Sequence, residues 1–267
     1  QGPGQMYDAM GGRIQEMGGD IRTQHEVLEV LHKNQRVWAV KVRDPDGQVR
    51  QVRGQHFCSS IPLTELIERM RPHPPDAVLA AARALTFRNL VVVNLILDQA
   101  DLFPDNWVYV HANSLDLGRI QNYKNWSPWM VPDPSTTSLG LEYFCSSHEP
   151  MWTMPDAQLL NKAAAELDQT GLKGTARVTD GMVLRIPRAY PVYIRGYEEH
   201  LKVIIEYVQQ FDNLHPMGRY GMFKYNNSDH SIMTALLTVE NIMGATHDVW
   251  NVNTETAYHE IRGSLRD

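Results

Sequence analysis

The sequence has few cysteines, no excess of positive charge and no long hydrophobic run. Each of these absences excludes a class of protein. Its 267 residues include two cysteines, Cys58 and Cys145. Both lie far apart in apolar or aromatic surroundings, which is typical of buried thiols and excludes a disulfide framework. No cluster of histidine and cysteine has metal-ligand spacing, and no carboxylates are paired at a recognisable spacing. We therefore expect a cytoplasmic protein without a metal site.

The charge balance is mildly acidic. A formal net charge of −6 and a pI of about 6.0 leave no general basic field for phosphates or anionic lipids. Neither nucleic acid nor a membrane surface is expected as a partner. No apolar run is long enough to span a bilayer, and the start lacks the pattern of a secretory signal. With 43% hydrophobic residues the chain can bury a large core, so we expect a soluble globular protein.

The first third of the chain alternates helix and strand signals. The three- and four-residue spacing of Met6, Met10, Ile14 and Met17 predicts a short amphipathic helix. A three-stranded β-meander is predicted next, ending near Ser59, with a DPDG turn between its second and third strands. Further elements are predicted as helices over 59–70, 76–85, 155–169 and 196–211 and strands over 88–98, 106–112, 117–125, 138–147 and 177–193.

The segment GRYGMFKYNNSDHSIMTALLTVENIMG, Gly218 to Gly244, carries the strongest functional signal. Ile232, Leu236 and Val239 recur with helical period, which predicts a helix that starts near Asp229 and ends at Gly244. Its N-terminus, capped by the preceding polar residues, suits a phosphate or the electron-rich edge of a cofactor. The Gly-rich stretch before it predicts a strand that lies close to something flat or charged. The plain alternative is a capped core helix after a Gly-rich turn.

This segment resembles the C-terminal flavin-binding segment of the amine oxidase-like FAD enzymes, which include protoporphyrinogen oxidases, phytoene desaturase-like proteins and UDP-galactopyranose mutases. The shared pattern is Gly-Arg-aromatic-Gly, a further aromatic residue, and an Asn-Ser-Asp-His turn that opens a helix. The opening GPGQMYDAMGGRIQEMGGDIRTQHEVLEV resembles the Gly-rich turn, helix and strand of the same group, and FCSSIPLTELI resembles the return from its meander. The resemblance covers nearly the whole chain.

The resemblance implies an α+β fold. In it, an antiparallel-sheet substrate domain with helices accompanies the β-meander and C-terminal helix of a glutathione-reductase-type FAD domain. The implied division is a partial FAD-binding domain over 1–62, a substrate-binding domain over 63–210 and a C-terminal FAD-binding segment over 211–267.

The resemblance also implies FAD as cofactor and assigns residues to it. Gly4 belongs to the turn near the flavin ring, Val27 would hold the adenine through its backbone, and Gly218 and Arg219 would approach the pyrophosphate. The helix start would surround the pyrimidine edge of the isoalloxazine, where negative charge on reduced flavin is stabilised. The remaining FAD contacts are expected from Ser59, Pro62, Asn227, Ser228, Asp229 and His230. His230 is also the candidate catalytic residue, with orientation of the loop as its alternative role.

The middle of the chain mixes cations with aromatic rings. Cations bind phosphate or carboxylate groups, and aromatic faces stack on a base or a sugar. A small anionic or nucleotide-sugar-like substrate is therefore expected, although tyrosine and tryptophan in a sheet often belong to its core. The candidate substrate residues are Arg119, Tyr123, Trp126, Tyr143, Arg185, Arg188, Tyr190 and Tyr193.

One element of the family pattern is absent. No strand is followed by a G-x-G-x-x-G turn, whose backbone holds the pyrophosphate of the dinucleotide. The opening also lacks methionine, as in a chain entered midway. Three alternatives follow: the missing element is a separate polypeptide that acts as a partner, it has been removed, or the chain is a shortened homologue with a different task.

Three functions follow from these observations. The first is an FAD-dependent oxidoreductase that transfers a hydride from substrate to flavin once the chain is completed. The second is a flavin-dependent nucleotide-sugar mutase, and the third is a non-catalytic ligand-binding module that has lost its dinucleotide-binding element.

Overall fold

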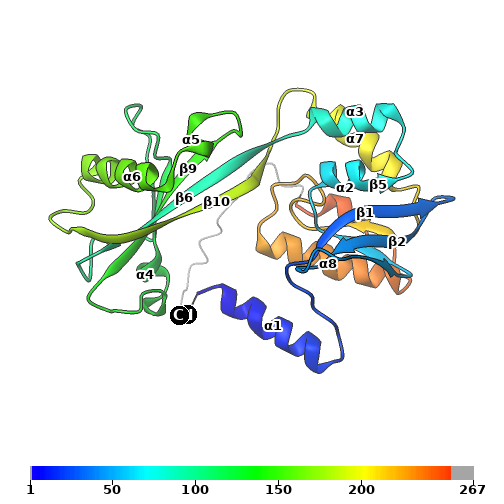
Figure 1. Cartoon of the computed structure of the whole chain (residues 1–267), viewed down its shortest axis with the longest axis horizontal. Coiled ribbons are helices and arrows are strands. Elements are labelled where there is room, and N and C mark those ends of the chain that lie inside the picture. Colours follow the sequence, from blue (N-terminus) through cyan, green and yellow to red (C-terminus); the bar gives the residue numbers. More distant parts are fainter. Residues whose placement is uncertain (1, 254–267) are drawn as a thin grey trace, which may run out of the picture. The chain divides into compact units, whose positions relative to one another are not determined.

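The computed structural model describes residues 2–253, which form two compact units (Figure 1). Among the described residues, the first unit combines residues 2–23 with Phe87–Val192, and the second combines Gln24–Thr86 with residues 193–253. Each unit therefore contains two separate segments of sequence. The three-part division predicted from the sequence concerns what each part binds, and it stays a prediction.

The first unit contains helix α1 and a five-stranded sheet. Helix α1 (Gly4–Glu16) occupies the predicted position, although all of its described side chains remain partly or fully exposed. The sheet has the strand order β10-β6-β9-β8-β7, with antiparallel pairs among β6, β9, β8 and β7. Its strands are β6 (Thr86–Leu97), β7 (Trp107–Tyr109), β8 (Arg119–Asn122), β9 (Thr137–Cys145) and β10 (Val178–Val192). Short helices α4 (Tyr123–Trp126), η1 (Pro128–Met130) and α5 (Pro150–Thr153) and the longer α6 (Asp156–Thr170) complete the unit.

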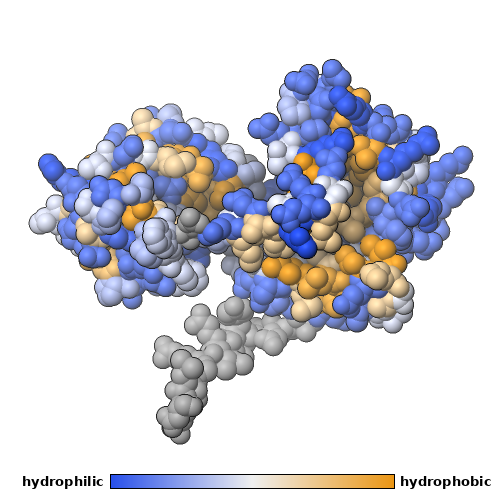
Figure 2. Space-filling model, turned by 90° about the horizontal axis from the view of Figure 1, so that it is seen from below, coloured by the Kyte–Doolittle hydropathy of each residue, from blue (hydrophilic) through white to orange (hydrophobic). Residues whose placement is uncertain are grey.

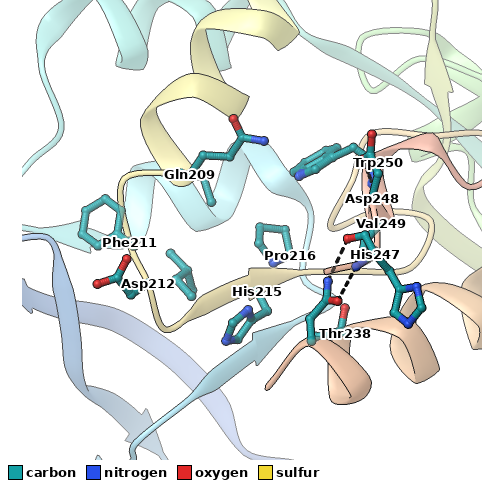
Figure 3. Close-up of a pocket in the computed structure, with 13 residues that line it drawn as sticks. Gln209, Phe211, Asp212, His215, Pro216, Thr238, His247, Asp248, Val249 and Trp250 are labelled. Atoms are coloured by element: carbon teal, nitrogen blue, oxygen red, sulfur yellow. Dashed lines mark hydrogen bonds between the residues drawn. The ribbon is translucent and has the colours of Figure 1, made fainter. Parts of the chain in front are cut away.

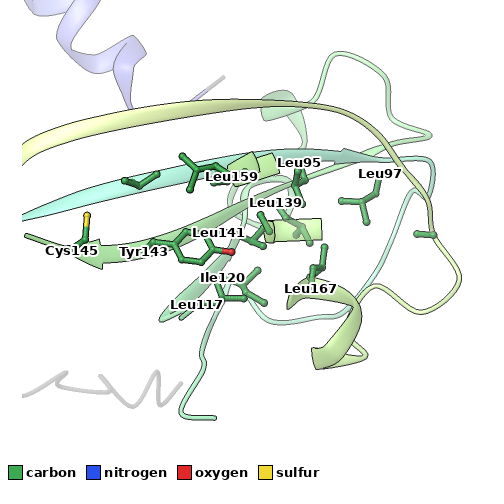
Figure 4. Close-up of a cluster of buried hydrophobic side chains, with 14 residues drawn as sticks. Leu95, Leu97, Leu117, Ile120, Leu139, Leu141, Tyr143, Cys145, Leu159 and Leu167 are labelled. Atoms are coloured by element: carbon green, nitrogen blue, oxygen red, sulfur yellow. The ribbon is translucent and has the colours of Figure 1, made fainter. Parts of the chain in front are cut away.

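One face of this sheet forms a hydrophobic core (Figure 4). Alternate residues of neighbouring strands point to the same face, so the register of β6 and β9 places Val91 opposite Tyr143 and Val93 opposite Leu141 on that face. Helix α6 contributes Leu159 and Leu167 to the same cluster. The alternation is strict through both strands, so the residues between these positions lie on the opposite face.

The second unit begins with the predicted meander. Strands β1 (Glu26–Lys33), β2 (Arg36–Arg43) and β3 (Val49–Arg53) pair antiparallel, and the short β5 (Met70–Arg71) adds a parallel strand beside β1. The third strand was predicted to continue to Ser59, and this prediction is wrong. The chain leaves the meander at Gly54 and forms β4 (Phe57–Ser59), which pairs parallel with β11 (Leu214–Pro216), 155 or more residues away in sequence.

Four helices and a short 3-10 turn belong to the second unit. Helices α2 (Leu63–Arg69), α3 (Asp76–Ala84) and α7 (Tyr197–Val208) lie within the predicted segments, and each presents its buried residues on one side. Helix α8 (Ser228–Ile242) begins within one residue of its predicted start, and η2 (Val249–Asn251) follows it. The stretch before α8 was predicted to be a strand, but it forms a series of turns.

Helix α8 has its apolar residues on the outside. Its buried positions are Thr234 and Thr238, whose hydroxyls hydrogen bond to nearby backbone groups. The predicted apolar face is exposed instead: Leu236 is 55% exposed and Val239 is 51% exposed. Figure 2 shows hydrophobic residues gathered at the surface of the unit that contains α8. A helix that is apolar on its open side is suited to pack against a further element.

The fold class is confirmed as α+β with an antiparallel sheet, and its assignment to the glutathione-reductase type stays a prediction. Among residues 2–253, none of the helices has the length and apolar character needed to cross a membrane.

Candidate functional site

The five-stranded sheet has a second face, opposite the core, which we call the open face. Two cross-strand rows define it: Tyr109, Arg119, Glu142 and Val92 in one, and Trp107, Gln121, Gly140 and Asn94 in the next. Phe144 and Leu90 continue it beyond the first row. Because paired residues share a face, the register alone gathers charged, amide and aromatic side chains there.

An ion pair lies at the centre of the open face. The Arg119 Nε atom is 2.8 Å from the Glu142 Oε2 atom, and the Gln121 amide donates to the other carboxylate oxygen at 2.5 Å. The side chain of Arg119 is 14% exposed and that of Glu142 is 3% exposed. Burial acts against the charge on Arg119, but the Glu142 carboxylate outweighs burial and raises the pKa of Arg119 above its ordinary value. The Arg119 charge is therefore held beside a carboxylate that opposes it.

Aromatic rings surround this ion pair. The Arg119 guanidinium carbon lies 5.4 Å from the Trp107 ring centre, 5.6 Å from that of Tyr109 and 5.9 Å from that of Phe144. These distances are typical of cation–π contacts. The Tyr190 hydroxyl lies 3.4 Å from a terminal nitrogen of Arg119. The guanidinium is thus enclosed by rings as well as by its carboxylate.

Two predicted substrate residues of helix α4 reach the same face. Trp126 contacts Trp107 edge to face, with ring centres 5.6 Å apart. Tyr123 lies over Gly140 so closely that a Cβ at position 140 would be 2.1 Å from its hydroxyl oxygen. Burial raises the pKa of Tyr123, and the nearby Glu142 charge adds to that effect. Four predicted residues are therefore brought together: Arg119, Tyr123, Trp126 and Tyr190.

Other predicted substrate residues lie elsewhere. Tyr143 belongs to the hydrophobic core on the opposite face, where burial raises its pKa. Arg185 donates to the Trp152 carbonyl at 3.0 Å and to the Asp156 carboxylate at 2.6 Å, so it fastens β10 to the neighbouring helices. Arg188 has a φ of +56°, and its backbone N–H donates to the Asn89 side chain at 2.9 Å.

Tyr193 belongs to the second unit. Its hydroxyl accepts a hydrogen bond from the Tyr225 N–H at 2.8 Å, and its ring stacks on Tyr197 at 4.5 Å. It therefore supports the turn that leads to helix α8.

The start of α8 is capped from both sides. The Asn227 side chain accepts from the backbone N–H of His230, and the His230 ring Nδ1 lies 3.3 Å from the Asn227 N–H. Within the described part of the chain, the N–H groups of Ser228 and Asp229 have no hydrogen-bond partner. Asn227, Ser228 and Asp229 are exposed, and His230 is half-buried. The arrangement orients His230 as part of the cap and leaves two donors at the positive end of the helix.

The preceding turn depends on close backbone contacts. Gly218 has a φ of +78°, and its N–H donates to the Thr234 hydroxyl at 2.9 Å. Arg219 donates to the Asn226 carbonyl at 2.9 Å, and its guanidinium lies 4.3 Å from the Tyr225 ring centre. The buried Asn226 in turn donates to the Gly218 carbonyl at 3.1 Å. The turn is therefore held by its own polar groups.

The remaining predicted FAD contacts are distributed over both units. Ser59 lies at the end of β4 and accepts from the Met217 N–H at 2.9 Å, and Pro62 directly precedes α2. These two residues lie in the segment that packs against the Gly218 turn, since the Leu63 N–H donates to the Tyr220 carbonyl. The Val27 carbonyl accepts from Arg69. Gly4 is the first residue of α1 and belongs to the first unit.

Sequence analysis did not identify a cavity of about 260 Å³ in the second unit (Figure 3). It lies between the end of α7, strand β11 and helix α8, and Phe211, His215, Thr238 and Trp250 contribute to its wall. The His215 Nε2 atom lies 3.1 Å from the His56 Nδ1 atom. Burial lowers the pKa of His215. Among residues 2–253, no group of three or more histidine, cysteine or acidic side chains is placed to hold a metal ion.

Sequence analysis also missed Glu142, Trp107 and Tyr109. Strict alternation in the 138–145 segment is the signal that marks Glu142, because it places this residue on the face away from Leu141 and Tyr143.

Solved structures share this fold at low sequence identity. A UDP-galactopyranose mutase in its reduced state matches 92% of this chain and 52% of its own length, with 18% identity and a TM-score of 0.78. A protoporphyrinogen oxidase-like protein from Exiguobacterium sp. 255-15 matches 88% of this chain and 50% of its own, with 17% identity and a TM-score of 0.63. An oxidoreductase from Methanosarcina mazei matches 86% and 53%, with 12% identity and a TM-score of 0.59.

The chain thus spans about half the length of the solved structures that it matches. No curated protein matches it. A family model does: it describes flavin-containing amine oxidoreductases and matches residues 1–185. This match covers more than half of the 267 residues, and the protein therefore belongs to the family of flavin-containing amine oxidoreductases.

Proposed function

We propose that this chain contributes the substrate-binding sheet and the C-terminal part of the FAD site of an FAD-dependent oxidoreductase. The observation that carries the proposal is the family match over residues 1–185, since that family contains flavin. When bound, FAD supplies the acceptor for a hydride that leaves a C–H bond of the substrate. The chain's own residues bind and orient the two reactants.

The start of α8 fits the requirements of a flavin edge. The N–H groups of Ser228 and Asp229 are exposed donors at the positive end of a 15-residue helix. Asn227 and His230 form reciprocal hydrogen bonds between side chain and backbone, and these bonds hold the two N–H donors in place. We propose that Ser228 and Asp229 donate to the pyrimidine edge of the ring and that His230 positions the loop. On this view His230 is a positioning residue.

The Gly218 turn lies beside the end of β4. Gly218 has a positive φ and Gly221 packs against the Ser59 carbonyl oxygen, so two buried glycines hold the turn close to that strand. We propose that Gly218, Arg219, Ser59 and Pro62 line the dinucleotide and that Val27 contributes from β1.

A further polypeptide segment is part of this proposal. The sequence contains no G-x-G-x-x-G element, and β4 pairs with β11 in a sheet of only two parallel strands. Parallel sheets are normally larger and covered on both faces. The outward apolar side of α8 offers a second surface for the added segment. We propose that a dinucleotide-binding element from outside these 267 residues completes the site.

The open face is the proposed substrate surface of the first unit. This face carries an ion pair, an amide and several partly exposed rings. A sheet face with only a structural role does not require such a combination of groups. Arg119, Tyr123, Trp126 and Tyr190 are the predicted residues that we retain there.

A nucleotide-sugar mutase is the second candidate, favoured by the likeness to UDP-galactopyranose mutase. The two candidates differ in net chemistry: an oxidoreductase consumes an electron acceptor as substrate is oxidised, whereas a mutase requires prior reduction of flavin and leaves the oxidation state of the substrate unchanged. A non-catalytic module is the third candidate, and it predicts ligand binding without flavin.

The test is a visible absorbance spectrum of the chain with added FAD, alone and after co-expression with a dinucleotide-binding segment of a related enzyme. Protein-bound flavin bands in the completed protein are expected. A completed protein that stays colourless while its open face still binds ligand would reject both flavoenzyme candidates and support the binding module.

A further inference from the structure

We propose that the open face binds an uncharged ring, either an aromatic ring or a pyranose, and that Glu142 sets this preference by neutralising Arg119. The inference rests on the proposed use of this face for substrate. It departs from the expectation of an anionic substrate held by arginine.

The first step is the charge of the face. Arg119 is the one cation in the two cross-strand rows, and its guanidinium is bonded to Glu142 at 2.8 Å. A ligand anion that recruited Arg119 would leave the Glu142 carboxylate, which is 3% exposed, without its partner. Breaking a buried pair in this way costs more free energy than a typical exposed ion pair returns. The pair therefore disfavours an anion at this position.

The second step is the engagement of nearby cations. The Lys124 ammonium donates to the carbonyl oxygens of Ala100, Pro134 and Thr136 at 2.6–3.1 Å. Arg185 donates to Asp156 and to backbone carbonyls, as described above. The Arg88 guanidinium donates to the Phe144 carbonyl at 2.8 Å and lies 3.5 Å from Glu149. Each of these three cations already has fixed acceptors.

The third step is the exposed surface that remains. Trp107 is 42% exposed, Tyr109 is 54% exposed and Trp126 is 50% exposed. Strand β10 adds apolar surface, because Met182, Leu184 and Ile186 are exposed and alternate with the core-facing Val183. Strand β10 is the edge strand opposite β7, so this apolar surface lies across the sheet from the rings. The partly exposed rings favour stacking on a flat ligand face, and the amide of Gln121 and hydroxyls of Tyr109 and Tyr190 offer hydrogen bonds to uncharged polar groups.

Gly140 and Tyr123 shape the second row of the face. The absence of a side chain at position 140 allows the Tyr123 ring to lie against the sheet and to fill that row. A ligand ring would therefore contact Trp107 and Trp126 at the β7 edge, beside Tyr123.

The test uses two probes that differ by one charge, phenyl β-D-glucopyranoside and phenyl β-D-glucuronide. Binding to the full chain is followed by saturation-transfer NMR, which detects weak ligands. We expect the neutral glucoside to bind at least about tenfold more tightly, equivalent to about 1.4 kcal/mol. Trp107→Ala should weaken glucoside binding at least about fivefold, as loss of a stacking ring does. Equal or tighter binding of the glucuronide, or no binding of either probe, would overturn the inference.

Glu142→Gln tests the role of the carboxylate. This change keeps the shape of the side chain and releases the charge of Arg119, so the preference for the glucoside should disappear or reverse. Asp168→Asn is the matched control, because it removes a carboxylate from an exposed pair with Lys173 in the same unit, and it should keep the preference. An unchanged preference in a folded Glu142→Gln protein would overturn the assignment to Glu142.

A salt titration covers the case in which Glu142→Gln fails to fold. Affinity of the wild-type chain for the glucoside should change less than about twofold between low and high salt, since no ligand charge is screened. A steep loss with salt would instead show a charged site. Flavin content is read separately by absorbance, so a chain that takes part in an FAD site but ignores the glucoside rejects this inference and leaves the proposed function intact.

Discussion

Gly221 packs against the carbonyl oxygen of Ser59 with no room for a side chain. A Cβ at position 221 would lie 2.5 Å from that oxygen and 2.4 Å from the Met217 carbonyl oxygen. Both atoms belong to the backbone, so neither can rotate away. The contact joins the end of β4 to the turn before α8, two segments that the proposed FAD site uses together.

Gly221→Ala should therefore lower the free energy of unfolding by more than about 2 kcal/mol, the scale of an overpacked core. Chemical denaturation with fluorescence detection measures the change. Gly12→Ala is the control, because Gly12 lies in helix α1 with open space around it. That variant should be unchanged or more stable by up to about 1 kcal/mol. A Gly221→Ala protein as stable as the wild type would show that the backbone shifts easily here.

Asn227→Ala removes the cap of α8 and should cost about 1 kcal/mol of stability. If Asn227 holds the exposed donors in place, flavin content of the completed protein should also fall, measured as the ratio of flavin to protein absorbance. Asn241→Ala changes the same residue type near the other end of α8 and serves as control. Asp229→Pro removes one of the two backbone donors in the first turn of the helix. Normal flavin content in both Asn227→Ala and Asp229→Pro would exclude this helix start from the cofactor site.

Loss of the buried ion pair of the open face should lower the free energy of unfolding more than loss of an exposed pair does. Glu142→Ala leaves Arg119 buried without its carboxylate, with an expected loss of about 3 kcal/mol or more. Glu149→Ala removes a partner that is 36% exposed, and its loss should stay below about 1 kcal/mol. Urea denaturation of both variants compares the two values, and similar losses would show that the pair is well screened by solvent.

His215 should make the second unit less stable in acid. Burial, together with the neighbouring His56, lowers the pKa of His215 below 6.5 in the folded protein. The unfolded chain then binds the proton first, so stability present above pH 6.5 is lost as the pH falls toward the folded pKa. Urea denaturation on both sides of that pH should show a smaller loss in His215→Gln than in the wild type. His148→Gln, at an exposed histidine, should match the wild type.

Local patterns predicted much of this fold. The helical periods of α1, α3 and α7 and the alternation and DPDG turn of the meander are properties of short segments, and all of them appear at the predicted places. Strand β4 was assigned to the wrong sheet because its partner β11 is distant in sequence, and no local pattern reports a parallel pairing of that kind.

The side of α8 that is buried could not be read from hydrophobicity. Thr234 faces inward because its hydroxyl accepts the Gly218 N–H, a contact that depends on the preceding turn. Likewise, Arg119 was found as a candidate cation, but its partner Glu142 required the register of β8 against β9. The residue types of the site were thus predictable, whereas their pairing and net charge came from long-range contacts.

The chain passes between the two units after Thr23, Thr86 and Val192. Neither unit can therefore complete its folding from one continuous stretch of sequence, because its two segments are separated by a segment of the other unit. Contacts that close such long loops form late and slow the search for the native state. During synthesis all strands of the five-stranded sheet would be made before helices α7 and α8 of the second unit. A truncation before residue 193 should consequently leave the meander without its partners while the five-stranded sheet remains whole.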